Sequence, residues 1–274
     1  MEAGDPFSDG IVDSLCIEPL SQGGTLSRQD RWTDEHFREQ LLSIMDRKNH
    51  WAWTRFSGPK ISKAQLKIHY QQEYAVYVRD FPIFLGRLYS KTPSAEARRP
   101  LATNLYEEET GGLSLGKPHP ALFLKMMEAL GLQENHFQRI SLLPASRRYR
   151  RWLDEVTLSP SWLEGTAVIT IFVEGSIHDR KEIGDNPPAA PPIEEVLRNH
   201  FLVRHHQLDP SALDLIRAHY LVEHGHRLDA WQIVLKNATS HASRKRVYDH
   251  LHRSLDLWLA YREGVAKEAG IRPS

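Results

Sequence analysis

Residues 209–236, DPSALDLIRAHYLVEHGHRLDAWQIVLK, decide the fold class, because their apolar side chains recur at the spacing of an amphipathic α-helix. Asp209-Pro210 is a typical helix start. His219, Glu223 and His226 interrupt the apolar stripe at spacing i, i+4, i+7, so at about 100° per residue they fall within an arc of roughly 60°. The stripe consists of Ala212, Ile216, His219, Tyr220, Glu223, His226, Ala230 and Ile233. Two imidazoles and a carboxylate are therefore predicted on a core-facing surface, where they need partners or a metal ion.

The same helical period recurs in almost every segment after Trp32, and no run alternates in the way that strands do. We therefore predict an all-α domain of seven or more helices over residues 31–274, preceded by a flexible arm, residues 1–30, that lacks periodicity. Pro82 is expected to kink the second helix. The first predicted helix begins at Thr33. The others cover about 62–89, 94–112, 118–130, 146–156, 159–177, 192–201, 209–236 and 240–269.

The composition excludes several classes of protein. The 274 residues contain 35 Lys and Arg and 35 Asp and Glu, a balance that argues against a dedicated binder of nucleic acid or anionic membrane. A single cysteine, Cys16, rules out an intramolecular disulfide framework and any multi-cysteine metal site. The longest apolar run, 167–173, is too short to cross a bilayer, and no signal peptide is evident, so we expect a cytoplasmic protein.

Four acidic positions accompany the histidines on apolar helix faces. Glu73 is the lone acid on its stripe, and Glu174 lies in the most apolar helix. Glu108 and Glu109 fit their helix stripe equally well, so periodicity does not choose between them. His119 follows Glu109 by ten residues and begins the next helix.

Each acid alone has an ordinary explanation, because a buried Glu is more often salt-bridged to Arg than bound to metal. Several carboxylates and histidines on the core faces of separate helices are instead typical of dinuclear metal sites in helical bundles. Imidazole combined with carboxylate suits iron or manganese. A ferritin-like bundle needs two Glu-x-x-His pairs, and only Glu223-x-x-His226 has a suitable core placement here. The ferritin-like arrangement therefore does not fit this sequence.

The order of these residues resembles the haem-oxygenase-like diiron oxidases and oxygenases, relatives of pyrroloquinoline-quinone synthase and of the TenA-type thiaminase II fold. The resemblance rests on 104–111 (NLYEEETG), on 119–123 (HPALF) with Leu130-Gly131, and on 70–77 (YQQEYAVY). It covers roughly residues 32–270.

The resemblance implies a haem-oxygenase-like bundle that binds two Fe(II) ions per chain, one of them weakly, and uses O2 as co-substrate. Its ligands would be Glu73, Glu109, His119, Glu174, His219, Glu223 and His226, with Glu223 standing where the family usually has Asp. It also implies oxidation of a small amino-acid-like substrate in natural-product metabolism, by N-oxygenation or oxidative C–C cleavage. We expect that such an enzyme could form a homodimer.

Two other functions fit the same residues. A cofactorless oxidase similar to pyrroloquinoline-quinone synthase would keep the bundle without the metal ligands. A non-catalytic helical module would hold the acids and histidines in buried salt bridges. Metal content separates both from the iron enzyme.

Overall fold

Side-chain caps begin several helices where the sequence predicts. Thr33 accepts a hydrogen bond from the His36 N–H at the start of α1 (Asp34–Asp46). Ser62 and Ser240 form full capping boxes before α3 (Lys63–Glu73) and α14 (His241–Glu268). Gly111 then ends α5 (Ala95–Thr110) at φ 62°, a conformation that favours glycine.

The structure, a computed structural model, describes residues 32–184 and 187–273, without the side chains of Glu223 and His224. All regular elements in these ranges are helical, which confirms the all-α prediction. The arm predicted for residues 1–30 lies outside the described residues. The other elements are α2 (Ala52–Phe56), η2 (Tyr74–Val78), α4 (Phe81–Lys91), α6 (His119–Ala129), α7 (Asn135–Gln138), α8 (Pro144–Leu158), α9 (Trp162–Thr166), η3 (Ala167–Val173), α10 (Asp179–Glu182), α11 (Ile193–Asn199), α12 (Phe201–His206), η4 (Pro210–Ala212) and α13 (Asp214–Asn237).

The helix predicted over residues 62–89 is divided rather than kinked at Pro82. It passes from α3 into the π-helical turn η2, breaks at Arg79-Asp80, and restarts as α4 with Pro82 in its first turn. Proline is tolerated there because the first amides of a helix have no intrahelical acceptor. The helix predicted over 159–177 ends at Val173, where Lys48 Nζ donates to the carbonyls of Phe172, Val173 and Gly175.

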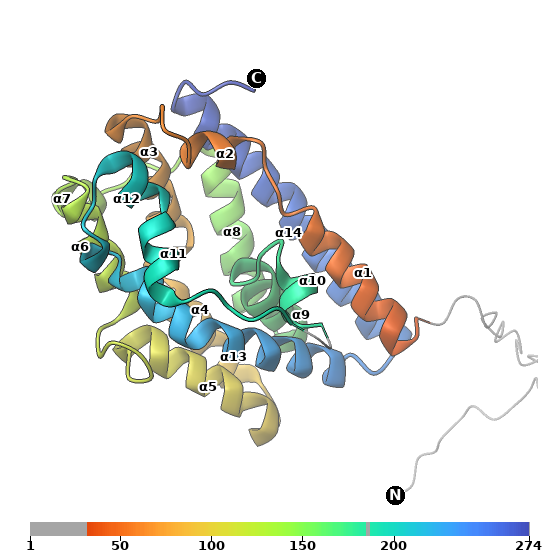
Figure 1. Cartoon of the computed structure of the whole chain (residues 1–274). Helices are drawn as coiled ribbons and strands as arrows, with labels where there is room; N and C mark the ends of the chain where they lie inside the picture. The colour runs from red at the N-terminus through yellow and green to blue at the C-terminus, as the bar shows by residue number, and fades with distance from the viewer. Residues whose placement is uncertain (1–31, 185–186, 274) are drawn as a thin grey trace, which may run out of the picture. The chain divides into compact units, whose positions relative to one another are not determined.

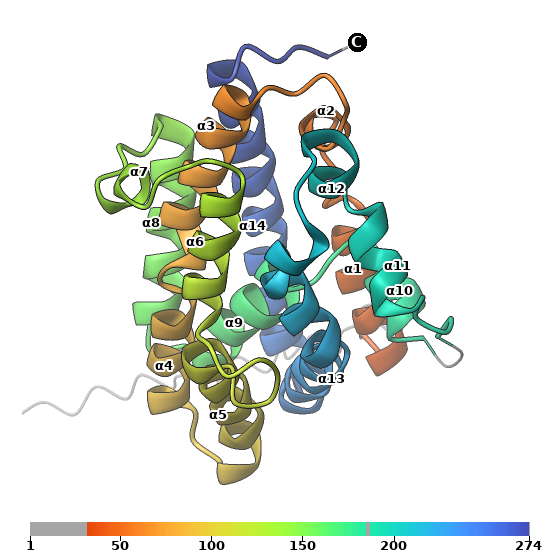
Figure 2. The same cartoon turned by 60° about the vertical axis from the view of Figure 1, so that its left-hand side comes forward.

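The π-helix η3 lies in the middle of the bundle, and Ala167 to Phe172 are completely or almost completely buried. Helices α13 and α14 both pack on η3, and α14 also packs on α1 and α8. Figure 1 shows α1 running alongside α14, and in the view of Figure 2 α9 and α14 lie between α3–α8 on the left and α1 and α10–α13 on the right. Helix α13 contacts α5, α6 and η3, and α5 contacts α6, so these four elements lie together although they are distant in sequence. Across the described residues, no helix is both long enough and apolar enough to span a membrane.

Candidate metal centre

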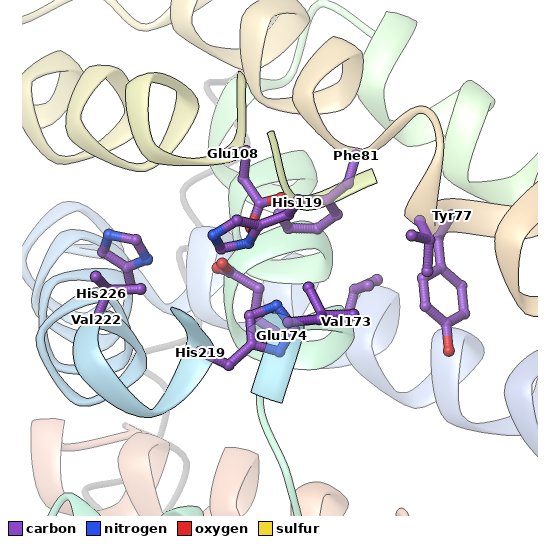
Figure 3. Close-up of a pocket in the computed structure, with 11 residues that line it drawn as sticks. Tyr77, Phe81, Glu108, His119, Val173, Glu174, His219, Val222 and His226 are labelled. Atoms are coloured by element: carbon purple, nitrogen blue, oxygen red, sulfur yellow. The ribbon is translucent and has the colours of Figure 1, made fainter. Parts of the chain in front are cut away.

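Three potential metal ligands meet between α5, α6 and α13. Glu108 comes from the last turns of α5, His119 is the first residue of α6, and His219 lies on α13. One ligand atom from each lies within 4.8 Å of the other two. Glu108 and His119 are buried and His219 is partly exposed. Figure 3 shows their side chains pointing toward one another. Three helices that are distant in sequence therefore supply a group of two imidazoles and one carboxylate.

A cavity of about 160 Å³ contains this group. Glu174, which directly follows η3, and His226 of α13 also line it. The rest of the wall is largely apolar: Tyr77, Val78, Phe81, Val173, Leu215 and Val222. In Figure 3 the Tyr77 hydroxyl points away from the histidines. The polar groups therefore face a small space with largely apolar walls, where charges interact more strongly than they do in bulk water.

His119 lies between two carboxylates. Its Nε2 is 3.0 Å from Glu107 Oε1 in hydrogen-bond geometry, so this nitrogen carries the proton that it donates to Glu107. Its Nδ1 is 3.0 Å from Glu108 Oε1, but it lacks hydrogen-bond geometry to any described partner. In the neutral imidazole, Nδ1 therefore directs a lone pair toward a carboxylate oxygen. Two electron-rich atoms at this distance require a cation, either a proton or a metal ion.

A metal ion fits this pair of atoms. Neighbouring ligands of an octahedral ion, each bound at about 2.1 Å, are about 3 Å apart. The Nδ1–Oε1 separation of 3.0 Å therefore matches two adjacent ligands of one ion. Imidazole and carboxylate donors suit iron, and two histidines with one carboxylate are typical of non-haem Fe(II) oxygenases. The donor set and its spacing thus fit an iron ion held by Glu108, His119 and His219.

Glu107 fixes the orientation of His119, a role that the sequence analysis did not assign to it. This completely buried carboxylate accepts hydrogen bonds from the Leu113 N–H at 2.7 Å, from the Ser114 hydroxyl and from His119. Burial alone would raise the pKa of Glu107, but these hydrogen bonds outweigh it and hold the pKa below its ordinary value. A carboxylate behind a histidine ligand is a common arrangement at metal sites. The available signal in the sequence was that Glu107 belongs, with Glu108 and Glu109, to an acidic triplet just before His119.

Glu174 and His226 lie beside the three-residue group. Asn104 of α5 donates from Nδ2 to Glu174 Oε1 at 2.8 Å, which orients that carboxylate; sequence reasoning did not single out Asn104. The His226 Nε2 is buried and has no hydrogen-bond partner among the described residues. Burial lowers the pKa of His226, which favours the neutral imidazole that binds metal. Both residues could serve a second ion in the same cavity.

The structure separates two other predicted ligands from the group. Glu109 is exposed, whereas Glu108 faces the cavity, because one residue of helix rotates a side chain by about 100°. Glu73 forms part of a different buried cluster, in which Arg262 Nη2 lies 3.1 Å from its Oε1. Glu223 belongs to α13, but its side chain is outside the described residues.

Two π-helical segments border the cavity. η2 supplies Tyr77 and Val78, and η3 supplies Val173 and leads directly to Glu174. π-helical turns are rare and are frequent at functional sites, because the wider turn re-aims the side chains that follow. The sequence pattern does not distinguish them from ordinary helix.

The family model of iron-containing redox enzymes with the haem-oxygenase-like fold matches residues 68–259, which include every residue of the three-residue group. The chain belongs to this family. Its members are iron-containing, in agreement with the donor set described above.

Part of the chain is also similar in sequence to known proteins. The chain is 28% identical over 106 residues to a 4-aminobenzoate synthase of Chlamydia muridarum, a match over 38% of this chain and 43% of the relative. It is 32% identical over 79 residues to that of Chlamydia trachomatis, covering 28% and 34%. The chain thus spans less than half the length of these relatives.

Two solved structures share the fold. A TenA homolog from Pseudomonas syringae pv. tomato superposes with a TM-score of 0.64 at 14% identity, covering 84% of this chain and 93% of that one. A CADD-like protein of unknown function from Nostoc punctiforme gives 0.61 at 16% identity, covering 86% and 98%. These likenesses confirm the predicted haem-oxygenase-like bundle.

Proposed function

We propose that this protein is a non-haem iron oxidase or oxygenase that uses O2 to oxidise a small amino-acid-like substrate. The contact between His119 Nδ1 and Glu108 Oε1 carries the proposal, because it places two possible metal donors 3.0 Å apart, a separation that fits adjacent ligands of one ion. His219 supplies the third donor. Two histidines and one carboxylate would hold an iron ion without filling its coordination sphere, and iron held in this way would supply the activation of O2.

A second iron would use the remaining groups of the cavity. Glu174 and His226 line it together with the first three residues, and Glu223 lies on α13 one turn before His226. The carboxylates of Glu174 and Glu223 would help to hold a second Fe(II) ion and would neutralise part of its charge. This set supports a dinuclear centre in which Glu108, His119 and His219 hold the better-defined ion.

With iron bound, the chain's own groups would do the rest. Glu107 keeps the proton of His119 on Nε2, so that Nδ1 remains available as a donor. Asn104 holds Glu174 in place through its hydrogen bond to Oε1. The apolar side chains of Phe81, Val173 and Val222 limit the entry of water. Exclusion of water protects reactive species from side reactions.

The substrate class is supported by the relatives. The Chlamydia proteins are named 4-aminobenzoate synthases, so their product carries both an amino and a carboxyl group, and a precursor with the same two groups is amino-acid-like. A reaction at such an amino-acid-like compound, by N-oxygenation or by oxidative C–C cleavage, is the reaction that we propose. The small volume of the metal cavity suits a reacting group of few atoms.

Anaerobic titration with Fe(II), followed by measurement of O2 uptake, tests this function. The wild-type chain should bind up to about two irons and consume O2 when candidate amino acids are added. His219→Ala should lose iron and O2 uptake, whereas His241→Ala, an exposed histidine at the start of α14, should behave like wild type. O2 uptake by rigorously metal-free protein would instead indicate a cofactorless oxidase. A folded wild-type chain that binds no iron would refute the proposal.

A further inference from the structure

A second cavity of about 290 Å³ adjoins the metal cavity. Tyr77 and Val173 line both, so their side chains form the wall between them. The other walls come from the segment around Lys48, from α2, α8 and α14, and from the segment after η3. Trp53 is 48% exposed, so the cavity reaches the molecular surface beside its ring. A molecule in this cavity would lie next to the metal site without occupying it.

The lining of this cavity is cationic. Lys48 and Arg262 line it, and no Asp or Glu is among the described residues that do. The Lys48 ammonium is held in place by three backbone carbonyls. Glu73 balances the charge of Arg262 from behind the wall. The Lys48 ammonium also interacts electrostatically with Asp179, so Arg262 is the cation placed to bind an anion in the cavity.

Arg262 also retains hydrogen-bonding capacity. Only 7% of this residue is exposed. Its Nη2 lies 3.1 Å from both Glu73 Oε1 and the Tyr77 hydroxyl, whereas Nε and Nη1 have no partner among the described residues. A guanidinium carries one N–H bond on Nε and two on Nη1. Buried donors of a charged group without acceptors are unfavourable, and an acceptor on a bound molecule would relieve this.

Aromatic rings surround the same guanidinium. The Arg262 Cζ atom is 5.1 Å from the centre of the Trp258 ring and 5.8 Å from that of Trp53. Lys48 Nζ is 5.9 Å from the Trp258 ring. Flat apolar rings next to cationic groups suit a ligand with an apolar, preferably aromatic, body and an anionic head. Arg is well adapted to recognise a planar carboxylate.

We propose that this second cavity is a binding site for a small aromatic carboxylate. Its carboxylate would lie toward Arg262 and its apolar body between Trp53 and Trp258. The volume is at the lower end of the roughly 300–1,000 Å³ typical of ligand pockets, which limits the ligand to about one ring and a short chain. The site stands on its own contacts; that its ligand is the substrate of the neighbouring centre rests on the proposed function.

Binding to metal-free protein tests this site independently of iron. The probes are benzoate, phenylacetate and 3-phenylpropanoate, each compared with its neutral amide by calorimetry and by the fluorescence of the tryptophans that line the cavity. At least one carboxylate should bind about 10- to 100-fold more tightly than its amide, the range expected for a charge-assisted hydrogen bond. Equal affinity of acids and amides, or no binding of any acid, would overturn the proposal, whether or not the protein binds iron.

Substitution of Arg262 locates the binding. Arg262→Gln should abolish the preference for the acid. Because this variant leaves Glu73 buried and unpaired, the double variant Glu73→Gln with Arg262→Gln, which removes both charges together, provides a second version expected to fold. The matched control is Arg253→Gln on the same helix, whose guanidinium stacks on Trp152 at 4.1 Å but is 60% exposed. Unchanged carboxylate binding in the folded double variant would place the ligand elsewhere and refute the site.

Discussion

Arg262 Nη2 donates to Glu73 Oε1 over 3.1 Å, across 189 residues of sequence, and thereby joins α14 to the end of α3. Tyr77 donates its hydroxyl proton to the same oxygen. His69 lies 3.3 Å from the other carboxylate oxygen, but burial lowers its pKa to about 4, so it is neutral near pH 7. Arg262 is therefore the countercharge of Glu73, which explains a buried acid on an aromatic face without any metal.

We expect Glu73→Gln to leave iron stoichiometry unchanged and to lower the free energy of unfolding. Removing one partner of a buried ion pair typically costs about 3–5 kcal/mol, because the other charge remains buried. Urea unfolding and iron analysis of the same preparation measure both effects. Glu128→Gln, at an exposed position of α6, is the control and should change neither. Loss of one iron from a folded Glu73→Gln protein would return this residue to the ligand set.

The acidic triplet should show one strong and one weak position. Glu108→Ala removes a donor that faces the cavity and should weaken Fe(II) binding by more than about 100-fold. Loss of a residue that only supports a metal ligand already costs up to about that much, and Glu108 is proposed to bind the metal directly. Glu109→Ala alters an exposed side chain and should bind iron within about twofold of wild type. Anaerobic Fe(II) titration of the two variants compares them directly. The opposite ranking would mean that α5 presents a different face to the site.

Glu107→Gln tests the support of His119. The amide oxygen can still accept the hydrogen bond from Nε2, but the negative charge that strengthens the imidazole as a donor is lost. Metal affinity should fall by about 10- to 100-fold. The visible absorption spectrum of Co(II)-substituted protein should shift, since the ligand field depends on His119. A spectrum and affinity identical to those of Glu109→Gln, its exposed neighbour, would show that Glu107 has no role at the metal.

His226 should separate the two metal positions. It lines the cavity but lies outside the three-residue group, and its buried Nε2 has no described partner. In a dinuclear centre, His226→Ala should reduce the iron content from about two ions to about one while the tighter ion remains. Equilibrium dialysis over a range of Fe(II) concentrations measures this. Wild-type stoichiometry in this variant would limit the second position to other residues.

Asp80 links stability to pH at the break between η2 and α4. Arg79 donates to it twice at 2.8 Å, and Arg150 donates to it as well. Burial alone would raise the pKa of Asp80, but these partners outweigh it and lower the pKa. A lowered pKa means that the carboxylate stabilises the fold above the unfolded-state pKa of about 3.9, and that this stability is lost as pH falls through the folded-state value.

Asp80→Asn should therefore lower the free energy of unfolding by about 2–3 kcal/mol at pH 7, with the difference shrinking below about pH 4. Urea unfolding at a series of pH values measures it. Asp249→Asn, at a half-exposed surface pair with Lys245, should stay within about 0.5 kcal/mol of wild type. A difference for Asp80→Asn that is independent of pH would indicate a packing effect instead of a charge effect.

Helix spacing, caps and composition were sufficient to predict an all-α bundle and to place His219 and His226 on one helix together with Glu223. These features are local, since they depend on the helical repeat and on the residues at each helix end, such as Ser62 and Ser240. The same pattern singled out Glu174 and His119, which resemblance to a known family then implied as metal ligands, and the structure places both in one cavity with His219 and His226.

Three features of the site region depend on the packing of helices that are distant in sequence. They are the choice of Glu108 over Glu109, the pairing of Glu73 with Arg262, and the support of His119 by Glu107. Both Glu108 and Glu109 continue an apolar stripe, and a rotation of about 100° separates them, so the rotational setting of α5 against α6 and α13 selects one. A buried acid needs a cation. The residues around Glu73 in the sequence do not say whether that cation is a metal ion or an arginine that follows 189 residues later.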